Sequence, residues 1–486
     1  MEHYFEEFRR KIVGVEQDFR TPYGIRRLIY ADWVASGRLY KDIEDRIVKD
    51  FGPFVGNSHT EASETGVLMT DAYNYAKYII KKHCNANEND VLISEGSGMT
   101  GVVNKLQRII GLKTCAAING KKCLSTIEKP VVFLSHMEHH SNHLSWLETN
   151  ADVVLLKPDK DLLVNPKQLR KELTKYSSRK IKIGAFTACS NVTGIETPIY
   201  ELAAIMHEFN GFLIADYAAS APYVPMDMHP SNPKERLDAI IFSPHKFLGG
   251  PGTSGICIFN RNLYSKTYPD HPGGGTIEWM SMRGDYKYIG NIESLEDGGT
   301  PGILQLIRVA LCIKLKEKMT SKRMQQREKE LLEMAFKELE DISGLHILAG
   351  EHKERLGIIS FCIEGIHYNL VVKILNDRFG IQLRGGCACA ATYGHYLLGI
   401  RSDEADEIIR NIEGGDLVNK IGWVRLSLHP TMTNLELSYI LNAIKQLVEN
   451  KEEWKMDYVY ISDSNEYRHK NEVKPFMKLD KEWFHL

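Results

Sequence analysis

The chain has 486 residues, of which 43% are hydrophobic and 26% charged, a composition typical of an ordinary globular protein rather than a disordered, collagenous or disulfide-dense one. Its 61 basic and 63 acidic side chains leave a formal charge of −2, so we expect neither nucleic acid nor an anionic membrane as a partner. This length exceeds the size at which a single hydrophobic core usually stops growing, which predicts a large domain and a smaller one.

Nine cysteines, an odd number, are scattered along the chain, which indicates reduced thiols. The first residues contain no basic patch followed by an apolar run, and no stretch of about 18 apolar residues occurs anywhere, so neither a signal peptide nor a membrane span is predicted. We therefore expect a cytoplasmic protein.

Residues 1–30 are predicted to form a helical arm that runs into a short strand at 28–31. Residues 31–313 then alternate short β-rich runs with helical patterns, which predicts a large α/β domain whose mostly parallel sheet has helices on both faces. Its strands are predicted at 91–94, 131–135, 152–156, 181–187, 212–215, 239–243 and 255–259. Residues 111–130, rich in lysine and cysteine, have the character of a local insertion.

A charged stretch from about 314 to 341 has no glycine or proline, and its apolar spacing predicts a long connector helix between domains. A smaller α+β C-terminal domain is predicted to follow, so that connector and small domain together span 314–450. Residues 451–486 mix aromatic side chains with many charges, and we expect this C-terminal extension to pack on the body of the protein.

Polar residues follow several predicted strands, and open α/β sheets bind ligands outside the carboxyl ends of their strands. Lys246, in the sequence Ser243-Pro244-His245-Lys246, could form an imine with an aldehyde once its pKa is lowered, although alone it could equally be a solvated loop lysine. Asp216 ends the strand at 212–215 and could keep a pyridinium nitrogen protonated, although an aspartate there more often caps a turn.

A glycine-rich turn, Glu95 to Gly101, joins a strand to a helix and could cradle a phosphate, since amides at a helix start favour an anion. The turn lacks the Lys-Ser or Lys-Thr of a nucleotide P-loop and the spacing of a dinucleotide fingerprint. His139, beside His140, could stack on a flat heteroaromatic ring or transfer protons; a plain surface position is the alternative. A metal site is the least favoured interpretation, because no spaced carboxylates or thiolates accompany the histidines.

The predicted small domain contains Arg384 and Arg425, whose guanidinium groups suit a bidentate grip on a substrate carboxylate. It also contains Cys387 and Cys389. The pair could be half of a metal site, but no second closely spaced pair of cysteines exists, so a thiol nucleophile is the better interpretation and no metal site is predicted.

Together these motifs resemble the class V, fold-type I pyridoxal-phosphate enzymes, and among them the cysteine desulfurase and selenocysteine lyase branch, over roughly residues 28–445. The resemblance implies pyridoxal 5'-phosphate as the cofactor and a homodimer as the assembly. It makes Lys246 the Schiff-base lysine, Asp216 the partner of the ring nitrogen and His139 the stacking histidine. The other cofactor contacts that it implies are Met99, Thr100, Ser243 and His245 at the phosphate, Asn191 near the phenolic oxygen, and Thr276, which would reach the phosphate of the neighbouring subunit.

The same resemblance implies that Arg425, assisted by Arg384, binds the carboxylate of L-cysteine or a related amino acid. The Arg-x-Gly-x-x-Cys-Ala pattern of the branch is matched from Arg384 to Ala390, which makes Cys389 the implied nucleophile and Cys387 its rival. The implied reaction leaves sulfur as a persulfide on Cys389 and releases L-alanine. A sulfur-acceptor protein is then a candidate partner.

Ala219 departs from the pattern, because relatives commonly have a glutamine three residues after the aspartate. Another reaction with the same cofactor, such as transamination, epimerisation or C–S β-lysis on a different amino acid, is therefore the alternative. A non-catalytic binding protein of the same fold is less favoured, because the lysine, aspartate, histidine and arginine are all present.

Overall fold

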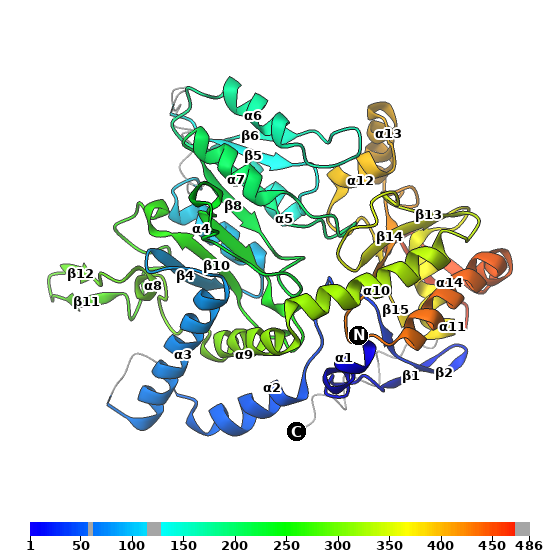
Figure 1. The fold of residues 1–486 in the computed structure, drawn as a ribbon, viewed down its shortest axis with the longest axis horizontal. Helices are drawn as coiled ribbons and strands as arrows, with labels where there is room; N and C mark the ends of the chain where they lie inside the picture. The colour runs from blue at the N-terminus through cyan, green and yellow to red at the C-terminus, as the bar shows by residue number, and fades with distance from the viewer. Residues whose placement is uncertain (57–61, 114–127, 472–486) are drawn as a thin grey trace.

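The computed structural model describes residues 1–56, 62–113 and 128–471. The predicted insertion at 111–130 and the end of the predicted C-terminal extension fall largely outside these ranges. Within them, no helix combines the length and apolar character needed to cross a membrane. Figure 1 shows a larger, sheet-centred part and a smaller part built mainly from the C-terminal third of the chain.

A seven-stranded sheet in the order β4-β10-β9-β8-β7-β5-β6 forms the centre of the larger part. Neighbouring strands pair in parallel, except that β10 is antiparallel to both β4 and β9. This confirms the predicted α/β fold with its mostly parallel sheet. The strands are β4 (Asp90–Glu95), β5 (Val131–Ser135), β6 (Asp152–Leu156), β7 (Lys182–Thr187), β8 (Phe212–Asp216), β9 (Ala239–Phe242) and β10 (Gly255–Asn260).

Helices cover both faces of this sheet, which explains why its inner strands are apolar almost throughout. Successive side chains point to opposite faces: Val132 and Ile214 belong to one apolar cluster, and Phe133 and Leu213 to the other. The first cluster includes side chains of α4 (Met99–Ile109) and α5 (His140–Leu147). The second includes side chains of α3 (Glu64–His83), α6 (Pro166–Lys175), α7 (Ile199–Glu208) and α9 (Ile303–Met319).

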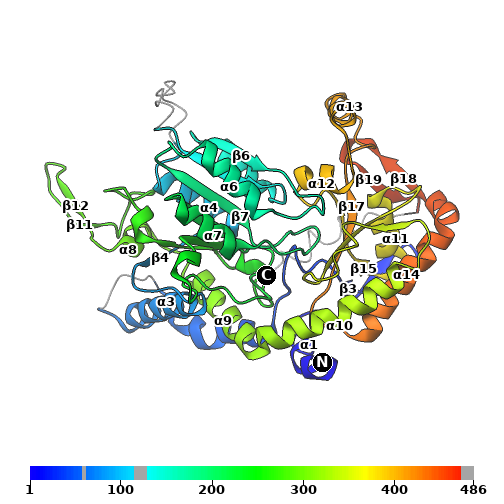
Figure 2. The same ribbon diagram turned by 45° about the horizontal axis from the view of Figure 1, so that its top comes forward.

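The connector consists of two helices and not of the single helical stretch predicted from about 314 to 341. Helix α9 ends at Met319, and α10 (Ser321–Leu339) begins after Thr320, whose φ of 57° interrupts the helical path. The break has a packing reason, because α9 packs against α3 of the larger part whereas α10 packs against α14 (Asn434–Trp454) of the smaller part. Figure 2 shows the two helices running in succession from one part to the other.

The smaller part is built on an antiparallel sheet in the order β13-β14-β17-β16. Helix α11 packs on β16 and β17, and α14 packs on α11. The strands are β13 (Leu345–Ile347), β14 (Ile358–Ile363), β16 (Arg384–Gly386) and β17 (Trp423–Ser427). The remaining helices are α11 (Tyr368–Phe379), α12 (Ala391–Leu397) and α13 (Ser402–Glu413).

The N-terminal arm contains a hairpin that the sequence did not predict. Between α1 (Glu2–Arg9) and β3 (Ile29–Tyr30), strands β1 (Asp18–Thr21) and β2 (Gly24–Arg27) pair antiparallel. Strand β3 then pairs in parallel with β15 (Ile381–Gln382), which brings the arm to the smaller part.

The described end of the chain also folds back on the body. Strands β18 (Tyr458–Ile461) and β19 (Glu466–His469) form a hairpin beside the arm, where the Tyr23 hydroxyl donates to Asp457 over 2.7 Å. Another hairpin, β11 (Ile277–Met280) and β12 (Tyr286–Tyr288), projects from the larger part next to α8 (Ile292–Leu295) (Figure 1). Helix α2 (Lys41–Arg46) completes the larger part, and the residue boundaries of the predicted domains stay predictions.

Candidate active site

A cavity of about 230 Å³ lies beyond the carboxyl ends of the parallel strands β5, β7, β8 and β9, where an open α/β sheet binds its ligands. Residues of the smaller part, from strands and from a loop, form its other wall. The structure gathers around it every predicted site residue except Thr276. These residues are Met99, Thr100, His139, Asn191, Asp216, Ser243, His245, Lys246, Arg384, Cys389 and Arg425.

Lys246 and Asp216 form the charged centre of this cavity. Lys246 sits in a turn directly after β9, and burial lowers the pKa of its ammonium group to about 8, although the Asp216 carboxylate opposes that change. Burial likewise raises the pKa of Asp216 to about 6, against the effect of the Ala218 amide, which donates to its carboxyl group over 2.8 Å. The pocket therefore contains an amine that deprotonates readily beside a buried carboxyl group.

His139 caps the N-terminus of α5, where its Nδ1 accepts the Ser141 amide over 3.1 Å. Nδ1 must therefore be unprotonated. Burial, together with the positive charge of Lys246, lowers the pKa of this imidazole to about 3, so the ring is neutral at physiological pH. A neutral, flat ring at the pocket wall can stack on an aromatic ligand.

Glu138 precedes this histidine and was not singled out by the sequence. Its fully buried carboxyl group accepts from the Ser135 hydroxyl, the Thr187 amide and the Asn142 side chain, and thereby joins the ends of β5 and β7 to α5. Burial raises its pKa to about 7. No local pattern predicts this role, because the link to β7 is made through Thr187, 49 residues away.

The predicted phosphate cradle lies at the start of α4. The Met99 amide donates to the Ser243 hydroxyl over 2.8 Å, and the Thr100 and Ser141 hydroxyls lie 2.7 Å apart. A Cβ atom on Gly98 would lie 3.2 Å from Ser243 Oγ and 3.3 Å from the His245 ring. Glycine thus keeps a small polar space open at the helix N-terminus, a place suited to an anion.

The two predicted arginines meet across paired strands. Arg425 in β17 faces Arg384 in β16, and Asp32 lies between them. One Asp32 oxygen accepts from an Arg425 Nη atom over 2.8 Å and the other from Arg384 Nε over 2.9 Å. Burial lowers the pKa of the Arg425 guanidinium group, while Asp32 opposes that effect. The sequence predicts no role for Asp32 in the site, although two neighbouring arginines in one pocket require a negative charge nearby.

Cys389 lies on a loop with an unusual backbone. Ala388 and Cys389 both have positive φ, 49° and 57°, a conformation that side chains other than glycine rarely adopt. Hydrogen bonds hold the loop in this form, since Asn191 Nδ2 donates to the Ala388 carbonyl and the His140 amide to the Cys389 carbonyl, each over 2.7 Å. Cys389 is exposed and lines the cavity, whereas Cys387 is half-buried and does not.

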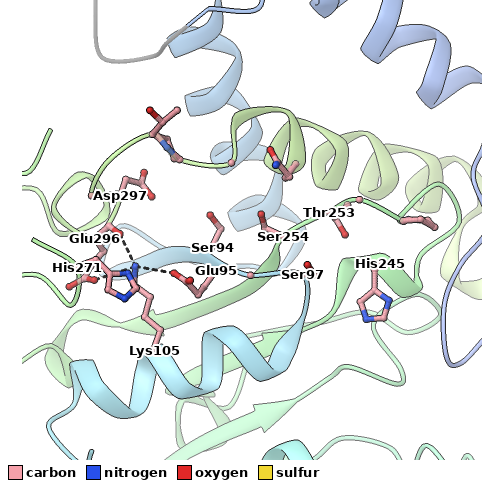
Figure 3. A pocket seen from close by; sticks show the side chains of 18 of the residues that line it. Ser94, Glu95, Ser97, Lys105, His245, Thr253, Ser254, His271, Glu296 and Asp297 are labelled. Atoms are coloured by element: carbon pink, nitrogen blue, oxygen red, sulfur yellow. Dashed lines mark hydrogen bonds and ion pairs between the residues drawn. The ribbon is translucent and has the colours of Figure 1, made fainter. Parts of the chain in front are cut away.

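A second cavity, of about 900 Å³, lies at the end of β4 and shares His245 with the first (Figure 3). The buried Lys105 Nζ lies 3.6 Å from the Glu95 carboxylate and 3.4 Å from that of Glu296, as the dashed lines in Figure 3 mark. This buried ammonium group is thus paired with two carboxylates. In the described ranges of the chain, no group of three or more His, Cys, Asp or Glu side chains could hold a metal ion.

Thr276 lies outside the first cavity. Its side chain is buried, and its hydroxyl donates to the Gly273 carbonyl over 2.6 Å within the glycine-rich turn. Gly298 packs against this threonine and, with His271, lines the second cavity. The predicted contact of Thr276 with a neighbouring subunit stays a prediction.

The sequence from 29 to 440 matches the model of one protein family, aminotransferase class V. The chain belongs to this family. It is 27% identical over 370 residues to a probable cysteine desulfurase of Halalkalibacterium halodurans, covering 75% of this chain and 84% of the relative. It is 25% identical over 431 residues to a probable cysteine desulfurase of Staphylococcus aureus, covering 87% and 93%. As a class V protein with such relatives, it is a pyridoxal-phosphate-dependent enzyme.

Solved structures agree on the fold of this class V enzyme. The apo cysteine desulfurase of Thermococcus onnurineus NA1 superposes with a TM-score of 0.72 at 21% identity, covering 92% of this chain and 98% of that one. The S-sulfonic acid form of the cysteine desulfurase CsdA from Escherichia coli gives 0.69 at 20% identity, with the same coverage. These matches confirm the predicted fold class.

The pocket of this class V enzyme fits pyridoxal phosphate. The Gly98 cradle offers the phosphate a space that a Cβ atom would fill, and the buried Asp216 carboxyl group suits a protonated ring nitrogen. Lys246 has the lowered pKa that an imine-forming amine needs. The neutral His139 ring completes a set that could hold each part of the cofactor.

Proposed function

We propose that this protein is a cysteine desulfurase that takes sulfur from L-cysteine as a persulfide on Cys389 and releases L-alanine. The position of the Cys389 thiol is the observation that best supports this proposal. It lies on a strained loop, exposed, in the wall of the same cavity as Lys246 and Arg425. A structural cysteine would be buried, as Cys189 and Cys257 are.

Bound pyridoxal phosphate supplies an electron sink that lets bonds near the substrate α-carbon break. In the proposal Lys246 holds the cofactor, Asp216 keeps its ring nitrogen protonated and His139 stacks on the ring. Arg425 and Arg384 bind the substrate carboxylate, and the amine of Lys246, freed on substrate binding, takes the α-proton. The Cys389 thiolate attacks the substrate sulfur, whose bond to carbon breaks, so enzyme thiol and L-cysteine become enzyme persulfide and L-alanine.

One observation supports a second class of reaction. Ala219, which lines the cavity, stands where relatives commonly have glutamine, so the surroundings of the cofactor differ from theirs at this position. Transamination, epimerisation or C–S β-lysis of another amino acid would use Lys246 and Asp216 but not Cys389. The products therefore decide between the two classes.

The test incubates the cofactor-loaded protein with L-cysteine and a thiol reductant, and measures sulfide, alanine and pyruvate together. We expect alanine to equal sulfide, Cys389→Ala to lose both products, and Cys387→Ala, the matched control, to keep most of the activity. Pyruvate in place of alanine would indicate β-lysis. Full activity of Cys389→Ala would refute the role of this thiol, and Lys246→Ala serves as the inactive reference.

We propose further that the enzyme is a cytoplasmic homodimer that passes its sulfur to an acceptor protein. The second cavity supports the dimer, because it adjoins the phosphate cradle at His245 and is bordered by residues next to the Thr276 turn. A second copy placed there could bring its Thr276 to the first copy's phosphate. The near-neutral charge of the chain gives no support to a nucleic-acid partner.

A further inference from the structure

We propose that Asp32 sets the carboxylate preference of the pocket by holding Arg384 at its rim. This inference rests on the proposed function only in that the pocket binds the carboxylate of an amino acid. Asp32 belongs to the N-terminal segment, 352 residues from Arg384 and 393 from Arg425, so no local pattern links it to them. Its role would be that of a positioning residue.

Hydrogen bonds fix the backbone of the segment that carries Asp32. The Ala31 carbonyl accepts the Ser427 amide over 2.9 Å, and the Val34 amide donates to the Ser427 hydroxyl over 3.1 Å, so the segment is attached to the end of β17 on both sides of Asp32. Trp33 stacks on His429 with ring centroids 4.0 Å apart. The backbone at Asp32 is therefore fixed, which limits where its carboxylate can lie.

The two arginines differ in exposure and in hydrogen bonding. Arg425 is 3% exposed, and both its Nη atoms are engaged, one by Asp32 and the other by the Asn191 carbonyl over 3.1 Å. The Arg384 side chain is 50% exposed and is joined to Asp32 through Nε. Among the described residues, no hydrogen bond engages the Nη atoms of Arg384. Arg425 is thus fixed, and Arg384 has its Nη atoms available for a ligand.

Asp32 also supplies negative charge beside the two arginines. Arg384 and Arg425 are direct partners across antiparallel strands, where like charges repel. Asp32 cancels one of the two charges and leaves a net charge of one, which matches a single carboxylate. Without Asp32, the buried Arg425 could not move, but the half-exposed Arg384 could turn into water at little cost. The pocket would then lose the arginine whose Nη atoms are free.

The experiment compares L-alanine with L-alaninamide, which differ in the carboxylate alone, and follows binding to the cofactor-loaded protein by its absorption spectrum. The readout is the ratio of the two dissociation constants, which a reduced folded fraction does not change. We expect the wild type to prefer L-alanine and Asp32→Asn to reduce that preference about tenfold, the size of one charge-assisted hydrogen bond. Asp32→Glu, which retains the charge, should restore part of it.

Two further variants show whether Asp32 acts through Arg384. Arg384→Ala should reduce the preference about as much as Asp32→Asn, and the double variant should lose no more than either, because the two changes remove one interaction. Asp152→Asn, the control, breaks an aspartate–arginine pair with Arg179 outside the pocket and should leave the ratio unchanged.

An unchanged ratio in Asp32→Asn, or losses that add in the double variant, would overturn the inference. So would a wild type without preference for L-alanine, since its arginines would then bind no carboxylate. Failure of the proposed function is distinguishable, because a protein that yields neither sulfide nor alanine from L-cysteine would leave the expected binding ratios intact. The binding result and the product result are independent.

Discussion

Burial of Lys246 lowers the free energy of unfolding at neutral pH. Its pKa of about 8 in the folded protein lies below the ordinary value of 10.5, so at neutral pH folding must bury a charged amine. That cost is present below pH 8 and disappears as the pH rises to about 10.5, where the unfolded chain also releases the proton. The lysine on which the proposed chemistry depends therefore destabilises the cofactor-free protein.

We predict that Lys246→Met stabilises the cofactor-free protein at pH 7 by about 1–3 kcal/mol, and that the gain falls towards zero by pH 10.5. Denaturant unfolding at several pH values measures this difference. Lys157→Met, a change at an exposed lysine, is the control and should have little effect at any pH. A gain that is independent of pH, or a loss of stability at pH 7, would contradict the explanation.

Residues that follow strands could be predicted from the sequence, and residues that act across long separations could not. Lys246, Asp216 and His139 each come shortly after a recognisable apolar strand, so the rule for open sheets placed them in one crevice. Asp32 and Glu138 act through partners far along the chain or on other elements. A single sequence records neither the pairing of β16 with β17 nor the position of Asp32, whose carboxylate bonds one arginine from each strand.

At the level of elements, Thr320 is the place where the predicted connector helix fails. Its φ of 57° and ψ of 123° lie outside the regions that a β-branched residue prefers, and its side chain makes no capping hydrogen bond to α10. The lack of glycine and proline in this stretch predicted an unbroken helix. The helix is interrupted because α9 and α10 pack on different parts of the molecule.

We predict that Thr320→Gly raises the free energy of unfolding by up to about 1 kcal/mol, because glycine adopts this backbone conformation without a Cβ clash. Thr320→Ala retains the Cβ atom and should bring no such gain. Chemical denaturation of the three proteins measures the effect. Equal stabilisation by alanine and glycine would show that the threonine side chain, and not its backbone conformation, is unfavourable.

The strands of the large sheet were predicted more accurately than the arm and the C-terminal extension. Strand β5 has its predicted bounds, because burial on both faces demands a continuous apolar sequence. The edge strand β6 also has its predicted bounds, although most of its residues are only half-buried. None of the four residues of β2 is buried and three of them are exposed, so its pattern carried no comparable signal. Short exposed strands are specified by their partners more than by their own composition.

In the whole molecule, the pocket forms where three distant regions meet. The large sheet contributes Lys246 and Asp216, the smaller part contributes Arg425, and the N-terminal segment contributes Asp32. Composition and length could predict two parts, but not the surface at which they meet. The proposed homodimer would add a fourth region, since Thr276 has no place in the pocket of its own chain.

We predict that mixing two variants, each expected to be inactive alone, restores part of the cofactor linkage if Thr276 belongs to this fourth region. Lys246→Ala lacks the lysine proposed to form the imine, and Thr276→Trp would block the turn proposed to reach the neighbouring subunit. If Thr276 acts across the dimer, each mixed dimer has one site with both an intact Lys246 and an intact neighbouring Thr276. With random reassociation, half of the dimers are mixed, so roughly a quarter of all sites should regain borohydride-reducible cofactor.

Mass spectrometry of the reduced chains measures this quantity, because only a chain with Lys246 can become labelled. A mixture of Lys246→Ala with wild type gives the upper limit of recovery under the same exchange conditions. Recovery needs subunit exchange, which a size tag on one variant detects independently. Exchange without recovered labelling would place Thr276 in its own chain's structure alone, and the glycine-rich turn would then serve the fold and not the neighbouring site.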